Sequence, residues 1–175
     1  MLLRTWRFVT LLLTALALTL TSAHVLELPQ KMSYGAELYS AVNTTLYRHF
    51  ATVGAVYTVG SIVAALVLVY LVRRSRAALA WTVAGTICLL LAFGSWLGLV
   101  APVNREIAEA LRTAPDSVPT LWLRLRSRWE YGHAVGFVLE LAGFCALLAS
   151  VLIETPRSAG DAGPALAPVG ERRGL

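Results

Sequence analysis

The side chains best suited to chemistry in this sequence are three histidines, His24, His49 and His133, each at the edge of an apolar stretch. Glu27 lies three residues after His24, and Glu130 lies three residues before His133. Residues three apart share a face of an α-helix, and a Glu-x-x-His pair aims both side chains at one point in the metal sites of helical bundles. The pattern predicts a shared His/Glu site, provided that the histidines meet.

A further carboxyl group lies deep in the last apolar stretch. Glu140 follows His133 by two helical turns, ~10 Å along a helix axis. A charged carboxylate at such a depth in a bilayer is costly, so we expect Glu140 to be paired, protonated or functional. Tyr57 lies two turns after His49, at a comparable depth, and we expect it to donate a hydrogen bond to Glu140.

The composition is that of a membrane protein. Hydrophobic residues make up 57% of the 175 residues and charged residues 14%, whereas an average soluble domain is about 25% charged. The net charge of +5 comes from arginines in short flanks beside apolar runs, where they set membrane orientation. They form no basic stripe for nucleic acid. We therefore expect the lipid bilayer as a partner, and no nucleic acid.

Four apolar stretches must position the candidate residues. They cover residues 8–28, 50–72, 77–101 and 133–153. Each is long enough to cross ~30 Å of hydrocarbon, and backbone amides in lipid must be paired within the segment, which requires helices. The sequence predicts an all-α fold: a four-transmembrane-helix bundle over residues 1–153, with a short amphipathic helical segment between the third and fourth helices. A disordered tail follows over 154–175.

The connections also contain predicted structure. The second helix is expected to start before the membrane, near Gly35. Asn104 is a candidate N-cap for a short helix over 105–112. A second amphipathic helix runs from about residue 120 into the last span, with Trp122 and Trp129 on one face. Tryptophans beside arginines are typical of the membrane interface, where the arginines either anchor the helix or attract an anionic lipid or substrate.

Orientation follows from the basic residues near the spans. The segments 4–7, 73–76 and 157–173 share one side in a four-span topology, and their arginines place both termini in the cytoplasm. All but one of the 15 basic residues are arginine. A preference for arginine over lysine is typical of proteins from GC-rich bacterial genomes, so we expect a bacterial inner membrane. His24, His49 and His133 then all lie at the outer side, at similar depth.

The first apolar stretch has a second interpretation. A basic segment over 1–7, an apolar run over 8–20 and the residues Thr21-Ser22-Ala23 resemble a cleaved signal peptide. Against cleavage, the apolar pattern continues to Leu28 and stops at Pro29, as a retained membrane helix would. We therefore favour a retained first span.

Three motifs resemble a known family. The segment HVLELPQKM at 24–32 resembles the end of the first helix in small four-helix membrane proteins of unknown function that are similar to the anthrone oxygenases of aromatic polyketide pathways. The segment 102–104 resembles that family's Pro-x-Asn element. The segment 122–133 resembles its Trp-rich approach to a histidine on the last helix. The resemblance covers most of residues 8–153.

The resemblance implies oxygenation of an electron-rich aromatic compound without a classical cofactor. By position, it implies a site made of His24, Glu27, Asn104, Trp129, Glu130 and His133. In this hypothesis a histidine acts as general base, giving a carbanion or phenolate that reacts with oxygen. The two glutamates orient the imidazoles, while Asn104 and Trp129 position an apolar small-molecule substrate.

Two alternatives remain open from the residues alone. The first is a metal- or haem-binding membrane protein, whose ligands would be His24, His49, Glu130 and His133. Copper or zinc is favoured there by the Irving–Williams order, with iron or haem as further candidates. The second is a non-enzymatic helical partner subunit or homo-oligomer, whose Gly94-x-x-x-Gly98 and Gly132-x-x-x-Gly136 patterns allow close helix contacts.

Overall fold

The structure, a computed structural model, is all-α over the described residues, 1–47 and 49–154. In chain order the helices are α1 (Leu2–Lys31), α2 (Ala36–Thr45), α3 (Phe50–Val72), α4 (Arg76–Ser95), α5 (Ala101–Thr113) and α6 (Val118–Ile153). A π-helical turn, Trp96–Val100, joins α4 to α5. A single 3₁₀ turn, Pro115–Ser117, precedes α6. The tail predicted over 154–175 lies, apart from Glu154, outside the described residues.

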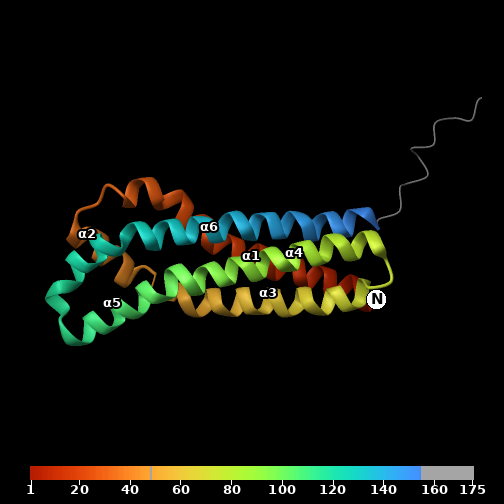
Figure 1. The fold of residues 1–175 in the computed structure, drawn as a ribbon, viewed down its shortest axis with the longest axis horizontal. Helices are drawn as coiled ribbons and strands as arrows, with labels where there is room; N and C mark the ends of the chain where they lie inside the picture. The colour runs from red at the N-terminus through yellow and green to blue at the C-terminus, as the bar shows by residue number, and fades with distance from the viewer. Residues whose placement is uncertain (48, 155–175) are drawn as a thin grey trace, which may run out of the picture.

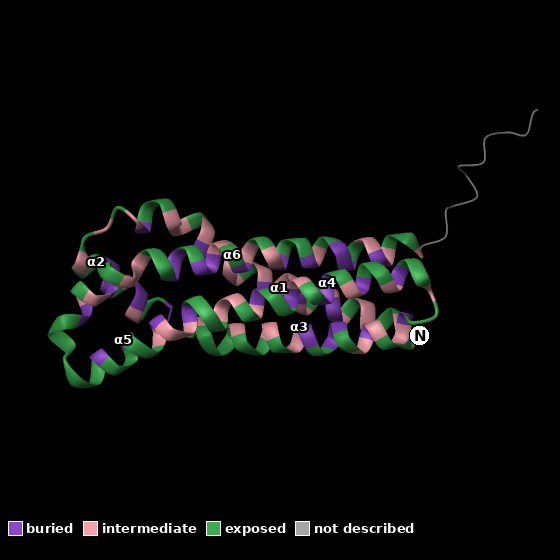
Figure 2. Cartoon of the chain, in the orientation of Figure 1, coloured by how far each residue is buried: buried purple, intermediate pink, exposed green. Residues whose placement is uncertain are grey.

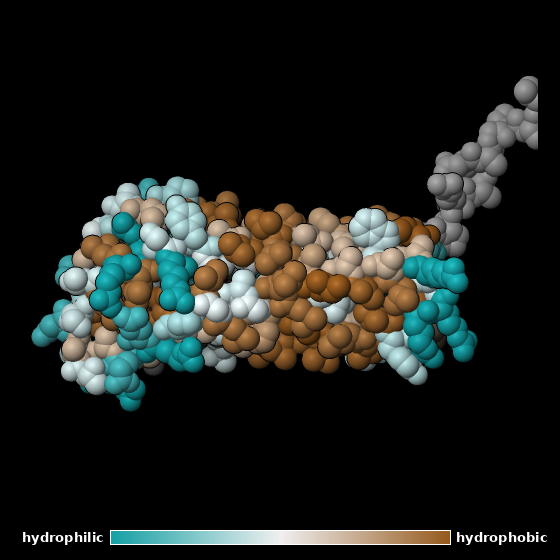
Figure 3. All heavy atoms as spheres, viewed as in Figure 1, coloured by the Kyte–Doolittle hydropathy of each residue, from teal (hydrophilic) through white to brown (hydrophobic). Residues whose placement is uncertain are grey.

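Four helical runs in the described chain are long and apolar enough to cross a membrane, which confirms the predicted four-span, all-α fold. The membrane helices form an up-and-down bundle in which α1 packs against α3 and α6, and α4 packs against the same two helices (Figure 1). The N-terminus and the end of α6 lie at one end of the bundle. On the face seen in Figure 3, a hydrophobic belt covers the middle of the molecule between two hydrophilic ends.

The opposite end carries a helical head, made of α2, α5 and the start of α6 (residues 118–129), beyond the hydrophobic belt. Its core consists of buried apolar residues from all three helices, including Tyr39, Val103, Ile107 and Trp122. On α5 the buried positions Val103, Ile107 and Ala110 recur at helical spacing, so one face of α5 closes onto the rest of the head.

The head corrects three sequence-based predictions. Asn104 is not an N-cap, because α4 continues through the π-helical turn and α5 begins at Ala101. The helix predicted to start near Gly35 does start there, but it ends at Thr45 and is separate from α3. Trp122 and Trp129 are 3% and 5% exposed, so they lie inside the protein rather than at the membrane interface, because α2 and α5 cover that face.

The helix α1 buries a polar stripe in the bundle. In Figure 2, buried residues recur along the membrane helices between exposed ones. Thr10, Thr14, Ala17 and His24 are all buried and follow a heptad-like spacing. The hydroxyls of Thr10 and Thr14 each donate to a backbone carbonyl four residues earlier, at 2.7 Å. Because these polar groups are satisfied within the helix, α1 can bury them without cost and leave its apolar residues to the lipid.

The helices α4 and α6 cross at two glycines. A Cβ atom on Gly85 would lie 2.8 Å from Leu147 Cγ and 3.0 Å from the Gly143 carbonyl oxygen. Of the four glycines in the predicted contact patterns, Gly132 alone has such close neighbours. A Cβ atom on Gly94, Gly98 or Gly136 would meet nothing within 4 Å. The close crossing therefore depends on Gly85 and Gly143, which the predicted patterns did not include.

We expect Gly85→Val to destabilise the bundle by about 1–3 kcal/mol, because the added side chain has to push α6 away from α4. The measurement is thermal unfolding in detergent, followed by tryptophan fluorescence. Gly94→Val, on the same helix and with open space around its Cβ, is the control and should unfold near the wild-type temperature. Equal unfolding temperatures for the two variants would show that a larger side chain fits at the crossing of α4 and α6, which would contradict this prediction.

Candidate functional site

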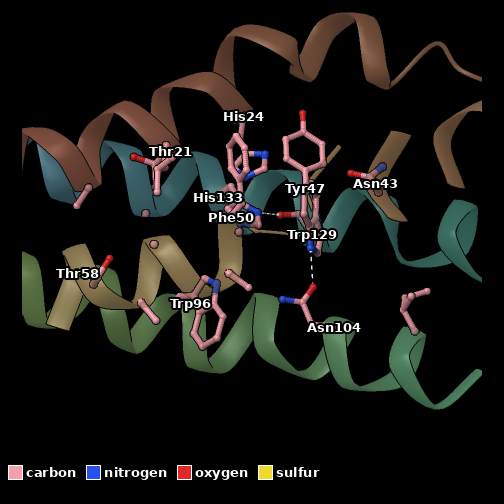
Figure 4. A pocket seen from close by; sticks show the side chains of 18 of the residues that line it. Thr21, His24, Asn43, Tyr47, Phe50, Thr58, Trp96, Asn104, Trp129 and His133 are labelled. Carbon is pink, nitrogen blue, oxygen red and sulfur yellow. Dashed lines mark hydrogen bonds between the residues drawn. The ribbon is translucent and has the colours of Figure 1, made fainter. Parts of the chain in front are cut away.

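A cavity of about 360 Å³ lies where the membrane bundle meets the head. Its walls come from α1, α2, α3, α5, α6 and the end of α4, and most of its lining is apolar or aromatic. Figure 4 shows the rings of His24, His133, Tyr47, Phe50 and Trp129 gathered at its centre. The cavity reaches inward along α6 through Gly136, whose missing side chain leaves room, to Glu140.

The structure brings His24 of α1 and His133 of α6 into contact. Their ring centroids are 4.1 Å apart at an interplanar angle of 42°, and the residues are 4% and 8% exposed. His133 Nδ1 lies 2.9 Å from the backbone oxygen of Trp129. A carbonyl only accepts hydrogen bonds, so this Nδ1 carries the proton and Nε2 is the free, basic nitrogen of a neutral His133 ring.

Aromatic rings fix the position of the two imidazoles. The Trp129 ring centroid lies 4.3 Å from that of His133 and 4.9 Å from that of His24. Trp129 Nε1 in turn donates to Asn104 Oδ1 over 2.9 Å. Asn104 and Trp129, two of the residues proposed to bind substrate, thus form a hydrogen-bonded pair in the cavity wall.

Four polar atoms of cavity-lining residues have no hydrogen-bond partner in the described chain. They are His24 Nδ1, Asn43 Oδ1, Tyr47 Oη and Trp122 Nε1. Each residue is more than nine-tenths buried, and a buried polar group left unpaired costs about 1–3 kcal/mol. The Asn43 amide nitrogen donates to the Tyr39 carbonyl over 2.8 Å, which leaves Oδ1 as a free acceptor. The cavity wall therefore contains unpaired polar atoms that are themselves almost fully buried.

Beside the cavity lies a buried ion pair that the sequence did not reveal. Lys31 Nζ lies 2.9 Å from Glu130 Oε1, and the two side chains are 2% and 0% exposed. Tyr39 Oη donates to the same carboxylate oxygen over 2.8 Å. Burial, together with the negative charge of Glu130, raises the pKa of Tyr39, which keeps it a donor. Lys31 Nζ also lies 4.7 and 4.8 Å from the ring centroids of Tyr47 and Trp129.

This ion pair changes the roles expected of the two glutamates. Glu130 binds Lys31 and Tyr39 rather than His133, because the buried ammonium needs a carboxylate. Glu27 Oε2 lies 3.8 Å from Lys31 Nζ, and its side chain is 41% exposed. Neither glutamate lines the cavity, so the imidazoles are oriented by the Trp129 backbone oxygen and by ring contacts instead.

Glu140 occupies the deep end of the cavity. It is 5% exposed, and its Oε2 accepts a hydrogen bond of 2.7 Å from Thr21 on α1. The hydrogen bond expected from Tyr57 is thus replaced by one from Thr21, because α1, whose polar stripe faces inward, packs directly against α6. Tyr57 is half-buried and lies outside the cavity lining.

The structure does not assemble the ligand set predicted for a metal. His49 is exposed immediately before α3 and does not line the cavity. Among the described residues, no group of three or more His, Cys, Asp or Glu side chains is placed to hold a metal ion. Of the four predicted ligands, only His24 and His133 are in contact in the cavity.

Sequence signals for the missed residues exist in hindsight. Lys31 is the only lysine of the chain and follows His24 by seven residues, two helical turns, on the inward stripe of α1. Asn43 and Tyr47 are four apart, one helical turn, and Tyr39 precedes Asn43 by another four. A polar residue recurring at helical spacing beside an apolar run indicates an interior face.

Fold and site together define an integral membrane helical bundle with a buried histidine-lined cavity. Comparisons of the chain with protein-family models, with curated proteins and with solved structures found no match. The resemblance to the anthrone oxygenase group therefore stays a prediction from motifs.

We expect Glu130→Ala to destabilise the protein by about 3–5 kcal/mol, because it leaves the buried Lys31 ammonium without a counter-charge. The double variant Lys31→Met with Glu130→Leu removes both charges and should recover much of the loss. Glu106→Ala, which breaks the exposed ion pair with Arg124, should change stability little. Chemical unfolding in detergent measures all three; a Glu130→Ala curve overlying that of Glu106→Ala would contradict the role assigned to the buried pair.

Proposed function

We propose that this protein is a membrane oxidoreductase that binds an apolar aromatic compound in the cavity and oxygenates it. The observation that carries the proposal is the contact between His24 and His133 within an aromatic-walled cavity that also holds unpaired polar atoms. A cavity of about 360 Å³ is in the size range of small-molecule sites. We place the protein in a bacterial inner membrane, with both termini cytoplasmic and the head outside.

The imidazole pair suits proton removal. Two imidazolium ions at this separation, close to the Lys31 ammonium, would repel each other strongly in a low dielectric. At most one of the two rings is therefore an imidazolium, and the other keeps a free basic nitrogen. In the neutral pair, His133 Nε2 is such a nitrogen and acts as general base. Trp129 and Phe50 offer ring faces to an aromatic substrate.

The proposed reaction balances with dioxygen as the oxidant and needs no further co-reactant. The base takes a proton from an activated ring methylene, and the resulting carbanion forms a C–O bond with dioxygen. The peroxide anion takes the proton back to give a hydroperoxide. Loss of the second C–H proton with cleavage of the O–O bond then yields a ketone and water, so that carbon is oxidised and dioxygen reduced.

We expect His133→Ala and His24→Ala each to lower the rate of oxygen uptake about 10²-fold or more, because general bases contribute about 10²–10⁴ in rate. The assay uses vesicle-reconstituted protein, a panel of polycyclic phenols and anthrones, and ¹⁸O₂ to follow the oxygen into product. His49→Ala, outside the cavity, is the matched control and should keep the wild-type rate. Unchanged uptake in both cavity variants would rule out the imidazole mechanism.

We expect Gly136→Leu to weaken binding of an aromatic compound at least tenfold without lowering stability, because the new side chain occupies cavity space and its Cβ meets nothing within 4 Å. Binding is measured by quenching of the fluorescence of Trp96, Trp122 and Trp129, all of which line the cavity. Gly94→Leu serves as control on the lipid-facing side of α4. Wild-type affinity in Gly136→Leu would mean that the compound binds elsewhere.

A further inference from the structure

We propose that the cavity is loaded sideways from the bilayer, through a window between α3 and α5 at the boundary between the hydrophobic belt and the head. The window is bordered by Ala51 and Ala55 on α3 and by Ala108 and Leu111 on α5. The proposal rests on the proposed function for the identity of the ligand, and on geometry alone for the route.

The four window residues both line the cavity and are exposed on the outside of the molecule. A residue with both properties marks a place where the cavity wall is open. All four side chains are apolar, and three are alanine, so they offer no hydrogen bond to water.

Helix packing explains the opening. α3 packs against α1 and α4, and α5 packs against α6 and the turns on either side of it, whereas no close packing joins α3 to α5 in the described chain. Figure 1 shows α5 diverging from the line of α4 after the π-helical turn at Trp96–Val100. After the π-helical turn, α5 leaves the line of α4 and extends beyond the end of the bundle where α3 begins.

The window spans the boundary between the hydrophobic belt and the head, because its α3 side lies in an apolar span and its α5 side lies in the head. Ala51 and Ala55 are in the first two turns of α3, whose sequence is apolar from Phe50 onward. Their exposed neighbours Val53 and Val56 have the character of lipid-facing residues. Phe93 and Trp96, half-buried in the cavity wall, stack at 6.3 Å with an interplanar angle of 5°, an arrangement that suits a flat aromatic compound.

The route through the head, in contrast, is closed. Tyr39, Val103 and Trp122 are 0%, 1% and 3% exposed and fill the head above the cavity. The Lys31–Glu130 ion pair lies in the same packed region, and its two side chains are 2% and 0% exposed. A compound in the bilayer therefore meets an apolar opening at this boundary, whereas the route through the head is blocked by a packed core.

The test follows the association of 1-hydroxypyrene, added in vesicles, with reconstituted protein by energy transfer from tryptophan. We expect Ala55→Phe to slow association about tenfold or more, because the ring narrows the window. The control is Val56→Phe, at the next residue, which is exposed to lipid and absent from the cavity lining. Its association rate should lie within about twofold of that of wild type. Ala108→Phe narrows the window from α5 and replaces Ala55→Phe if that variant does not fold.

Pyranine, a trisulfonated hydroxypyrene that stays in water, distinguishes the two routes. The proposal expects pyranine neither to bind nor to compete. Association of 1-hydroxypyrene at the wild-type rate in both window variants, or equally rapid binding of pyranine, would overturn the window, as would failure of wild-type protein to bind 1-hydroxypyrene. Oxygen uptake is not part of this test, so slow association in the variants combined with no turnover in wild type would support the window and reject the oxygenase.

Discussion

The ion pair between Lys31 and Glu130 is the interaction on which the site depends. It joins the end of α1 to α6, and Tyr39 adds α2 through the same carboxylate oxygen. A buried charge pair contributes little net stability, but removing one partner is strongly unfavourable. The pair joins α1 to α6 in the register in which His24 lies level with His133, so we expect it to contribute more to that register than to net stability.

The bilayer supplies the second constraint. Lipid accepts apolar side chains on the outside of every helix, so polar side chains gather in the interior, where they must find partners. Thr10 and Thr14 find them in their own backbone, and Thr21 finds one in Glu140. Where the bundle meets the head, some polar side chains have no hydrogen-bond partner. His24 is one of them, and its unpaired Nδ1 lies beside the cavity.

The sequence by itself determined the membrane architecture. The length and hydrophobicity of each apolar run set the number of spans, because the bilayer has a fixed thickness and requires helices. The same run lengths set the depth of each residue, which is why His24 and His133 could be expected at one level. The interior position of Glu140 followed equally, since a carboxyl group cannot face lipid without cost.

Only the tertiary structure decided which side chains meet. Depth along a helix does not determine the direction in which a side chain points or the neighbour on the next helix, so Glu130 was assigned to His133 although Lys31 binds it. Tryptophan beside arginine is typical of a membrane interface, but α2 and α5 enclose Trp129 in the protein. The cavity and its window arise from how α5 leaves the bundle, and helix crossings depend on contacts between segments distant in sequence, which a local pattern cannot specify.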